Sequence, residues 1–145
     1  MVFLSSEEMI QLIKLNELNT SDAVKLLEDI TRRIKSENRP FCRIFCKYSD
    51  SGKMGTIIES LYSKNISFDK ICLYTRSKNE QLVYYLNKLF PDRKLFEVHE
   101  GLTHLKSVDI ETHYTGNTLI IFNDLSTERC VNGEDRKMVE LYLRG

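Results

Sequence analysis

The sequence predicts an α/β domain with a mostly parallel central sheet flanked by helices. Apolar runs typical of strands, at residues 41–46, 70–75 and 118–122, alternate with segments whose apolar residues recur at helical spacing. Such alternation is typical of parallel sheets. The run at 118–122 is apolar throughout, which indicates a strand buried on both faces.

The first forty residues are predicted to form a helical hairpin. Ser5 and Glu8 have the spacing of a capping box, which starts a first helix, and a second helix begins at Ser21. Its apolar residues lie on one face and its charged residues on the other. We expect residues 1–39 to be this hairpin and residues 40–145 to be the α/β core that it covers, together forming one structural unit.

Turn signals and apolar periodicity define the elements that follow the first strand. Ser77 and Glu80 have the spacing of a second capping box. The predicted elements are, in order, a helix over 55–64, a strand over 70–75, a helix over 77–90, a short strand over 94–98, a loop over 100–117 with one helical turn at 102–105, the strand over 118–122 and a last helix beginning near 132.

The bulk composition excludes several classes of protein. The chain has 145 residues, enough for one domain with a core of its own. Its 21 basic and 21 acidic residues give no net charge, so no bulk attraction to nucleic acid is expected. No apolar run approaches a membrane span and no secretory signal begins the sequence, so no membrane partner is expected.

Cysteines and histidines give no recognisable metal motif. The four cysteines contain no C-x-x-C pair and are expected to be mainly buried free thiols; they are Cys42, Cys46, Cys72 and Cys130. The three histidines lack helical ligand spacing and are expected to be solvated or satisfied by polar neighbours; they are His99, His104 and His113.

The strand at 41–46 leads into a small polar turn that resembles a phosphate-binding loop. The residues of this turn are Ser49, Asp50, Ser51, Gly52 and Lys53. Backbone N–H groups of such a turn, at the start of a helix, can surround a phosphate, and the lysine can contact the terminal phosphates. Two positions depart from the G-x-x-x-x-G-K-[ST] pattern, because Lys47 replaces the first glycine and Met54 replaces the hydroxyl residue that binds magnesium.

A second polar turn, Asn123-Asp124, follows the buried strand at 118–122. Ligands of parallel sheets bind at the carboxyl ends of the strands, so the two turns are expected to lie at one edge. An acid in this position can hold magnesium or orient water. Asn123 is neutral, which leaves Asp124 as the candidate acid. Neither turn is specific alone, but their order and separation favour a nucleotide site.

These features resemble the genome-packaging ATPases of large double-stranded DNA viruses, in the FtsK/HerA superfamily of P-loop motors. Residues 71–75, 117–125 and 137–145 carry the resemblance, the last being similar to a helix and Arg-Gly turn that follow the acidic motif in that family. It covers residues 41–145 and implies a P-loop NTPase-like sheet.

The resemblance also implies a site and partners. In that family the Gly-Lys loop binds ATP, paired acids hold magnesium and activate water, and a ring of subunits pumps DNA into a capsid. It implies ATP binding by residues 49–54, Mg²⁺ binding by Asn123 and Asp124, and a catalytic role for Asp124. The implied partners are double-stranded DNA, capsid proteins and further subunits, either within the host cell or in the virion.

Departures from the family pattern set the expected activity. Met54 and Asn123 remove two direct magnesium anchors, so hydrolysis is expected to be weak or absent. The sequence stops at Gly145, where family members continue into further strands. One of those strands separates the loop strand from the acidic-motif strand. A gap is therefore expected between strands 41–46 and 118–122, unless the sheet rearranges, a partner fills it or the sequence is a piece of a longer chain.

Two further readings remain open. The first is a non-catalytic structural or interaction protein, derived from such an ATPase, that binds a capsid component or a full-length ATPase. The second and remoter reading is a nucleotide kinase or GTPase, for which the sequence has no basic lid and no guanine-reading motif.

Overall fold

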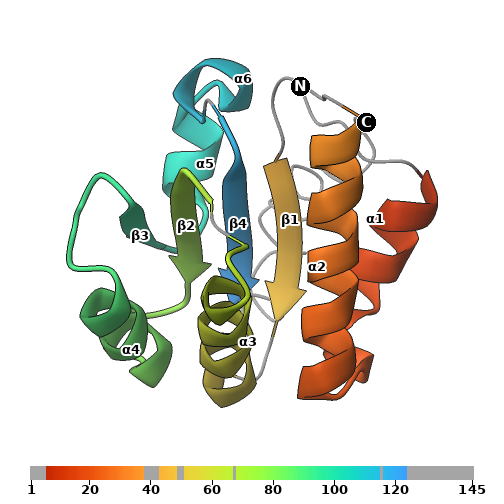
Figure 1. The fold of residues 1–145 in the computed structure, drawn as a ribbon. Helices are drawn as coiled ribbons and strands as arrows, with labels where there is room; N and C mark the ends of the chain where they lie inside the picture. Colours follow the sequence, from red (N-terminus) through yellow and green to blue (C-terminus); the bar gives the residue numbers. More distant parts are fainter. Residues whose placement is uncertain (1–5, 38–42, 49–50, 67, 115, 124–145) are drawn as a thin grey trace.

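A computed structural model describes residues 6–37, 43–48, 51–66, 68–114 and 116–123. Its elements are α1 (Ser6–Ile13), η1 (Leu15–Glu17), α2 (Thr20–Ser36), β1 (Arg43–Tyr48), α3 (Ser51–Ser63), β2 (Lys70–Thr75), α4 (Gln81–Leu89), β3 (Phe96–Glu100), α5 (Thr103–Ser107), α6 (Ile110–His113) and β4 (Thr118–Asn123). The predicted α/β class is confirmed, since the described strands form one parallel sheet flanked by helices (Figure 1).

The sheet has the strand order β1-β4-β2-β3, and every pairing in it is parallel. The gap does not occur; the sheet takes the rearranged form that was the stated alternative, because β1 pairs with β4 directly, from Arg43 opposite Thr118 to Tyr48 opposite Asn123. The described sheet is therefore continuous between these strands and needs no partner strand there. Direct pairing also departs from the strand order that the resemblance to packaging ATPases implies.

Strand β4 lies in the interior of the sheet, between β1 and β2. The predicted burial of residues 118–122 is confirmed, and the strand continues one residue further, to buried Asn123, which was expected in the turn that follows. Its side chains alternate between the two faces, so that Phe122 stacks on the ring of Tyr74 with 5.6 Å between centroids. The apolar side chains of this run, buried on both faces of the sheet, form the centre of the hydrophobic core.

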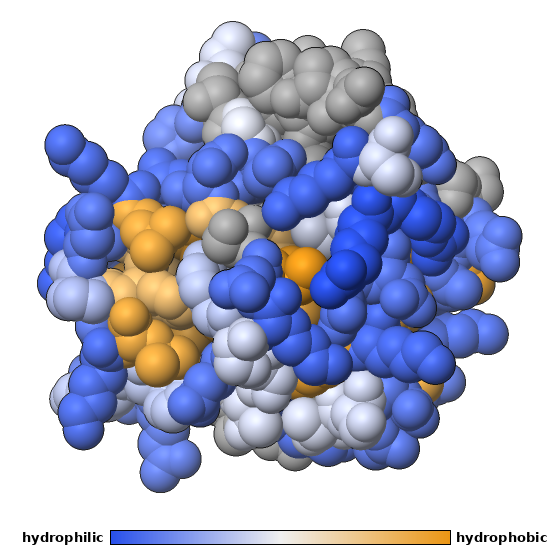
Figure 2. Space-filling view, viewed as in Figure 1, coloured by the Kyte–Doolittle hydropathy of each residue, from blue (hydrophilic) through white to orange (hydrophobic). Residues whose placement is uncertain are grey.

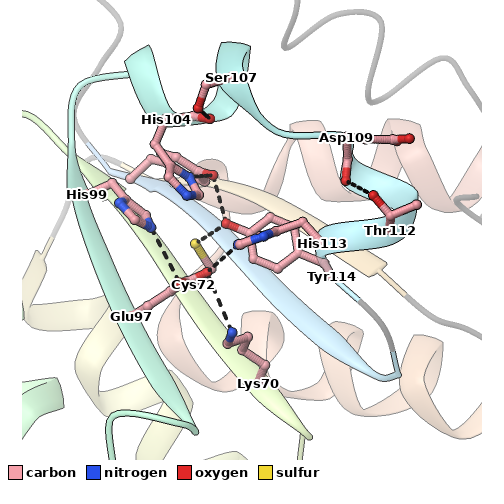
Figure 3. Close-up of polar contacts among 11 residues, drawn as sticks. Lys70, Cys72, Glu97, His99, His104, Ser107, Asp109, Thr112, His113 and Tyr114 are labelled. Carbon is pink, nitrogen blue, oxygen red and sulfur yellow. Dashed lines mark hydrogen bonds and ion pairs between the residues drawn. The ribbon is translucent and has the colours of Figure 1, made fainter.

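Helices cover both faces of the sheet. In Figure 1, α3 crosses in front of the sheet, with α2 and α4 on either side of it, and Figure 3 shows the face that carries α5 and α6. Helix α2 begins one residue before the predicted Ser21 and packs against α3. Its N-cap is Asn19, whose side chain accepts a hydrogen bond of 2.8 Å from the backbone N–H of Asp22.

Several predicted boundaries differ from the structure. Helix α3 begins at Ser51 instead of residue 55, and β3 is shifted by two residues from the predicted 94–98. Within the predicted loop at 100–117, the helical turn expected at 102–105 corresponds to α5, which is anchored by buried Leu102 and Leu105, and α6 is an additional short helix. Ser5 of the predicted capping box and the predicted last helix lie outside the described residues. Glu8, the other residue of that box, has its Oε2 atom 3.7 Å from Nη1 of Arg33 in α2.

The surface is unevenly polar. Figure 2 shows apolar side chains gathered over the α4 and β3 side of the molecule, whereas polar side chains cover the α2 side. Among the described helices, none is both long and apolar enough to cross a lipid bilayer.

Candidate functional site

The carboxyl ends of the four strands lie flush at one edge of the sheet. Tyr48 is aligned with Asn123, Asn123 with Thr75, and Thr75 with Glu100. Helix α3 begins at Ser51, shortly after β1 ends, so its first turn lies at this edge. That turn carries no acidic side chain. Its N–H groups and the positive end of the helix dipole therefore favour an anion.

Lys53, the predicted phosphate lysine, is half-buried in the first turn of α3. Its ammonium donates a hydrogen bond of 3.3 Å to the carbonyl oxygen of Leu18, which follows η1. A hydrogen bond from a charged donor is worth about 1.5–3 kcal/mol. An ammonium has three N–H donors, so this hydrogen bond does not by itself keep Lys53 from a phosphate.

Met54, which stands where the phosphate-loop pattern has a hydroxyl residue, packs in the hydrophobic core. Its side chain is completely buried, as are those of Ile57, Ile58 and Leu61. The four positions form one helical face at i, i+3, i+4 and i+7, which α3 turns toward the core. Met54 thus contributes to hydrophobic packing and offers no oxygen to a magnesium ion.

Asn123, predicted as a metal ligand, is also completely buried. Its side-chain Nδ2 donates a hydrogen bond of 2.8 Å to Oε2 of Glu80. The predicted capping box is wrong: Glu80 is the N-cap residue of α4 and its carboxylate makes no capping hydrogen bond, whereas Ser77 Oγ accepts from the N–H of Asn79. Glu80 therefore supplies an acid beside Asn123.

Thr75 completes the polar group at the carboxyl edge. It is aligned with Asn123 in the sheet, so both side chains face the α4 side. Its buried hydroxyl has no hydrogen-bond partner among the described residues. Thr75, Glu80 and Asn123 together with the first turn of α3 form what we call the edge site.

Some of the residues predicted for a nucleotide site lie at the carboxyl edge of the sheet. Gly52 and Lys53 lie in the first turn of α3, at the same edge as Asn123. The predicted residues Ser49, Asp50 and Asp124 lie outside the described residues, so their roles remain predictions. Glu80 was missed because it lies 43 positions from Asn123 and only the fold makes them neighbours.

A second polar group, which the sequence did not reveal, lies between the sheet and helices α5 and α6 (Figure 3). We call it the histidine cluster; its members are Lys70, Cys72, Tyr74, Glu97, His99, His104, His113 and Tyr114. The rings of His99 and His104 stack with 3.6 Å between centroids, and the ring of His113 stands edge-on to that of His104. The histidines therefore lie among polar neighbours, as expected, but the sequence did not predict that they lie together.

Hydrogen bonds link the tyrosines of this cluster to Cys72. The hydroxyl of Tyr114 lies 2.9 Å from Sγ of Cys72 and 2.7 Å from the hydroxyl of Tyr74, which in turn lies 3.0 Å from Nδ1 of His104. Cys72 is a buried free thiol, as predicted. Burial raises the pKa of this thiol above its usual value, so it is protonated in the protein alone.

The pKa of the Glu97 carboxyl group is set by burial and by its polar neighbours. Burial opposes the charged form, but the Lys70 ammonium and the Tyr114 hydroxyl outweigh it, so the pKa of Glu97 lies below its usual value. Burial, followed by the neighbouring His104, lowers the pKa of His99. The cluster therefore combines a carboxylate with a neutral imidazole.

The fold and the edge site define an α/β protein with a parallel sheet and a polar carboxyl edge. Comparisons with protein-family models, with curated proteins and with solved structures returned no match to this chain. The sites are therefore interpreted from their own geometry.

Proposed function

We propose that this protein binds a nucleotide through the first turn of α3 and the residues that precede it, with weak or absent hydrolysis. The observation that carries the proposal is the position of that turn. It lies at the carboxyl edge of a parallel sheet, carries no acidic side chain and includes Gly52 and Lys53.

Weak hydrolysis follows from the side chains that would have to hold magnesium. Met54 is buried in the core and offers no oxygen. The amide of Asn123 is engaged with Glu80, at 2.8 Å. A nucleotide bound here would be held chiefly by backbone N–H groups and by Lys53, with little contribution from the metal.

The proposal includes descent from viral packaging ATPases, which the sequence pattern of the two turns suggests. The direct pairing of β1 with β4 departs from the family's strand order, so nucleotide binding stands on firmer observations than DNA packaging does. Pumping of double-stranded DNA, binding of capsid proteins and assembly into a ring belong to the same proposal and rest on the resemblance. The alternative function, an interaction protein that binds no nucleotide, rested mainly on a missing strand between β1 and β4. These strands pair directly, so that argument no longer supports it.

Calorimetric titration of the full chain with ATP, with and without Mg²⁺, tests the proposal. We expect binding that changes less than about threefold when Mg²⁺ is removed, a difference of under about 0.7 kcal/mol. Lys53→Ala should weaken binding at least about tenfold, by the loss of one charge-assisted contact.

Lys64→Ala is the matched control, because Lys64 lies just beyond the opposite end of α3. It should bind ATP as the natural sequence does. Absence of ATP binding, or equal affinities for Lys53→Ala and the natural sequence, would refute the nucleotide site. Rapid Mg²⁺-dependent hydrolysis that Lys53→Ala abolishes would refute only the claim of weak turnover.

A further inference from the structure

We propose that Cys72, Glu97 and His99 form a binding site for a divalent transition-metal ion of the zinc type. Sγ of Cys72, a carboxylate oxygen of Glu97 and a ring nitrogen of His99 all lie within 4.8 Å of one another. Thiolate, carboxylate and imidazole are the ligands that zinc takes in proteins. This site is separate from the edge site and does not depend on nucleotide binding.

The sheet itself positions the three ligands. Glu97 and His99 are two residues apart on β3, so their side chains point to the same face. Cys72 of β2 is directly opposite Glu97 in the parallel register. Two adjacent strands thus hold three donors on the face beneath α5 and α6, and rigid elements of this kind give precise ligand geometry.

The spacing of the donors fits a small ion after a modest contraction. Metal–ligand distances of about 2.0–2.3 Å place the donors of a tetrahedral zinc site roughly 3.3–3.6 Å apart. Nε2 of His99 already lies 3.5 Å from Oε2 of Glu97. The widest separation, at most 4.8 Å, needs to close by about 1 Å.

Unsatisfied polar atoms at the centre of the group are an independent indication of a ligand. Oε1 of Glu97 and Nε2 of His99 are buried and make no hydrogen bond to any described residue. The charged and imidazole neighbours that these atoms have lie 3.5 to 3.8 Å away, too far for a good hydrogen bond, so both atoms can still gain from a ligand. A metal ion would satisfy both of them at once.

The surroundings supply the remaining features of a metal site. Nε2 of His113 lies 3.6 Å from Oε1 of Glu97, which places a further donor beside the fourth position. The Tyr114 hydroxyl, 2.9 Å from Sγ of Cys72, can donate a hydrogen bond to the thiolate and orient it. On binding, the S–H proton of Cys72 passes to solvent and a metal–sulfur bond forms.

Lys70 provides a way to separate a metal site from a purely structural polar cluster. Its ammonium lies 3.8 Å from Oε1 of Glu97, beyond hydrogen-bond distance. It therefore partly neutralises the carboxylate and repels an incoming cation. Lys70→Met keeps the aliphatic part of the side chain and removes the charge. At a metal site it should therefore raise the affinity for the ion several-fold. In a polar cluster that binds no metal, it would only remove a favourable ion pair with Glu97.

Titration of the full, chelator-treated chain with Co²⁺ tests the site, since a thiolate ligand produces a charge-transfer absorption in the near ultraviolet. We expect one ion per chain with this absorption, displaced by Zn²⁺. Cys72→Ser should abolish the absorption, and Glu97→Gln and His99→Gln should weaken binding at least about tenfold. Replacing Cys42, Cys46 and Cys130 together by serine is the control and should preserve the absorption.

Circular dichroism of each variant shows whether it folds. If Cys72→Ser fails to fold, His99→Gln and Lys70→Met decide the question, because they change less buried positions. Absence of the absorption in the natural sequence, or unchanged affinity in both Glu97→Gln and His99→Gln, would overturn the proposal. Weaker binding by Lys70→Met would do so as well.

Discussion

Two glycines have a left-handed backbone conformation, and one of them lies against a side chain that is hydrogen-bonded next to β4. Gly116 has φ of 79° and Gly101 has φ of 66°. A Cβ at Gly116 would meet Oδ2 of Asp69 at 2.6 Å, whereas a Cβ at Gly101 would meet nothing within 4 Å. The same Asp69 oxygen accepts a hydrogen bond from the backbone N–H of Asn117, at the start of β4.

Comparison of Gly116→Ala with Gly101→Ala therefore isolates the contact with Asp69. Gly101→Ala should lower the free energy of unfolding by about 1–2 kcal/mol, the cost of left-handed backbone for a residue with Cβ. Gly116→Ala should cost about 1 kcal/mol more, because the Asp69 hydrogen bond is also displaced. Urea denaturation measures both; equal losses would show that Asp69 moves aside freely.

Asn123 gives the second prediction at the residue scale. Asn123→Asp would supply an acid at a position where the packaging-ATPase pattern has one, but it places a buried carboxylate about 2.8 Å from that of Glu80. Two carboxylates so close cannot both ionise readily, so we expect a loss of roughly 2–4 kcal/mol in the free energy of unfolding at pH 7.

Glu80→Gln in the Asn123→Asp background is the control, since it removes the repulsion and keeps a hydrogen-bonding side chain. Thermal or urea unfolding should show that the double variant recovers most of the lost stability. If Asn123→Asp alone had the same free energy of unfolding as the natural sequence, Glu80 would not be held beside position 123.

Strand β4 is the element on which the core depends most. Phe122 is completely buried and stacks on Tyr74, and α4 offers a contrast in Tyr84, which is 70% exposed. Phe122→Ala should cost about 3–5 kcal/mol, from lost burial and the cavity left behind. Tyr84→Ala should change the free energy of unfolding by less than about 0.5 kcal/mol. Similar costs in urea denaturation would contradict the central position of β4.

Elements defined by local pattern were predictable, and contacts between distant segments were not. The strands at 70–75 and 118–123 follow from runs of apolar residues, which specify burial wherever the chain goes. The gap beside β4 was wrongly expected because strand order depends on which long-range pairing is most favourable. The histidine cluster was missed because β3 and α6 bring His99 and His113 together only after the sheet forms.

At the scale of the whole molecule, the sheet separates two polar regions. Asn123 and Thr75 face the α4 side at the carboxyl edge, whereas Cys72 and Tyr74 face α5 and α6. Variants of one region can therefore serve as controls for the proposed binding at the other. Of the first region, the sequence pointed to Lys53 and Asn123 but not to Thr75 or Glu80, and it contained no signal for the second region.

Nuclear magnetic resonance of the ¹⁵N-labelled full chain, titrated with ATP, tests nucleotide binding at the carboxyl edge most directly. We expect the largest amide shift changes at residues 51–54 and 75–80, with residues 103–113 unaffected, and we expect Lys53→Ala to suppress them. The absence of shift changes, or changes confined to residues 103–113, would contradict the account.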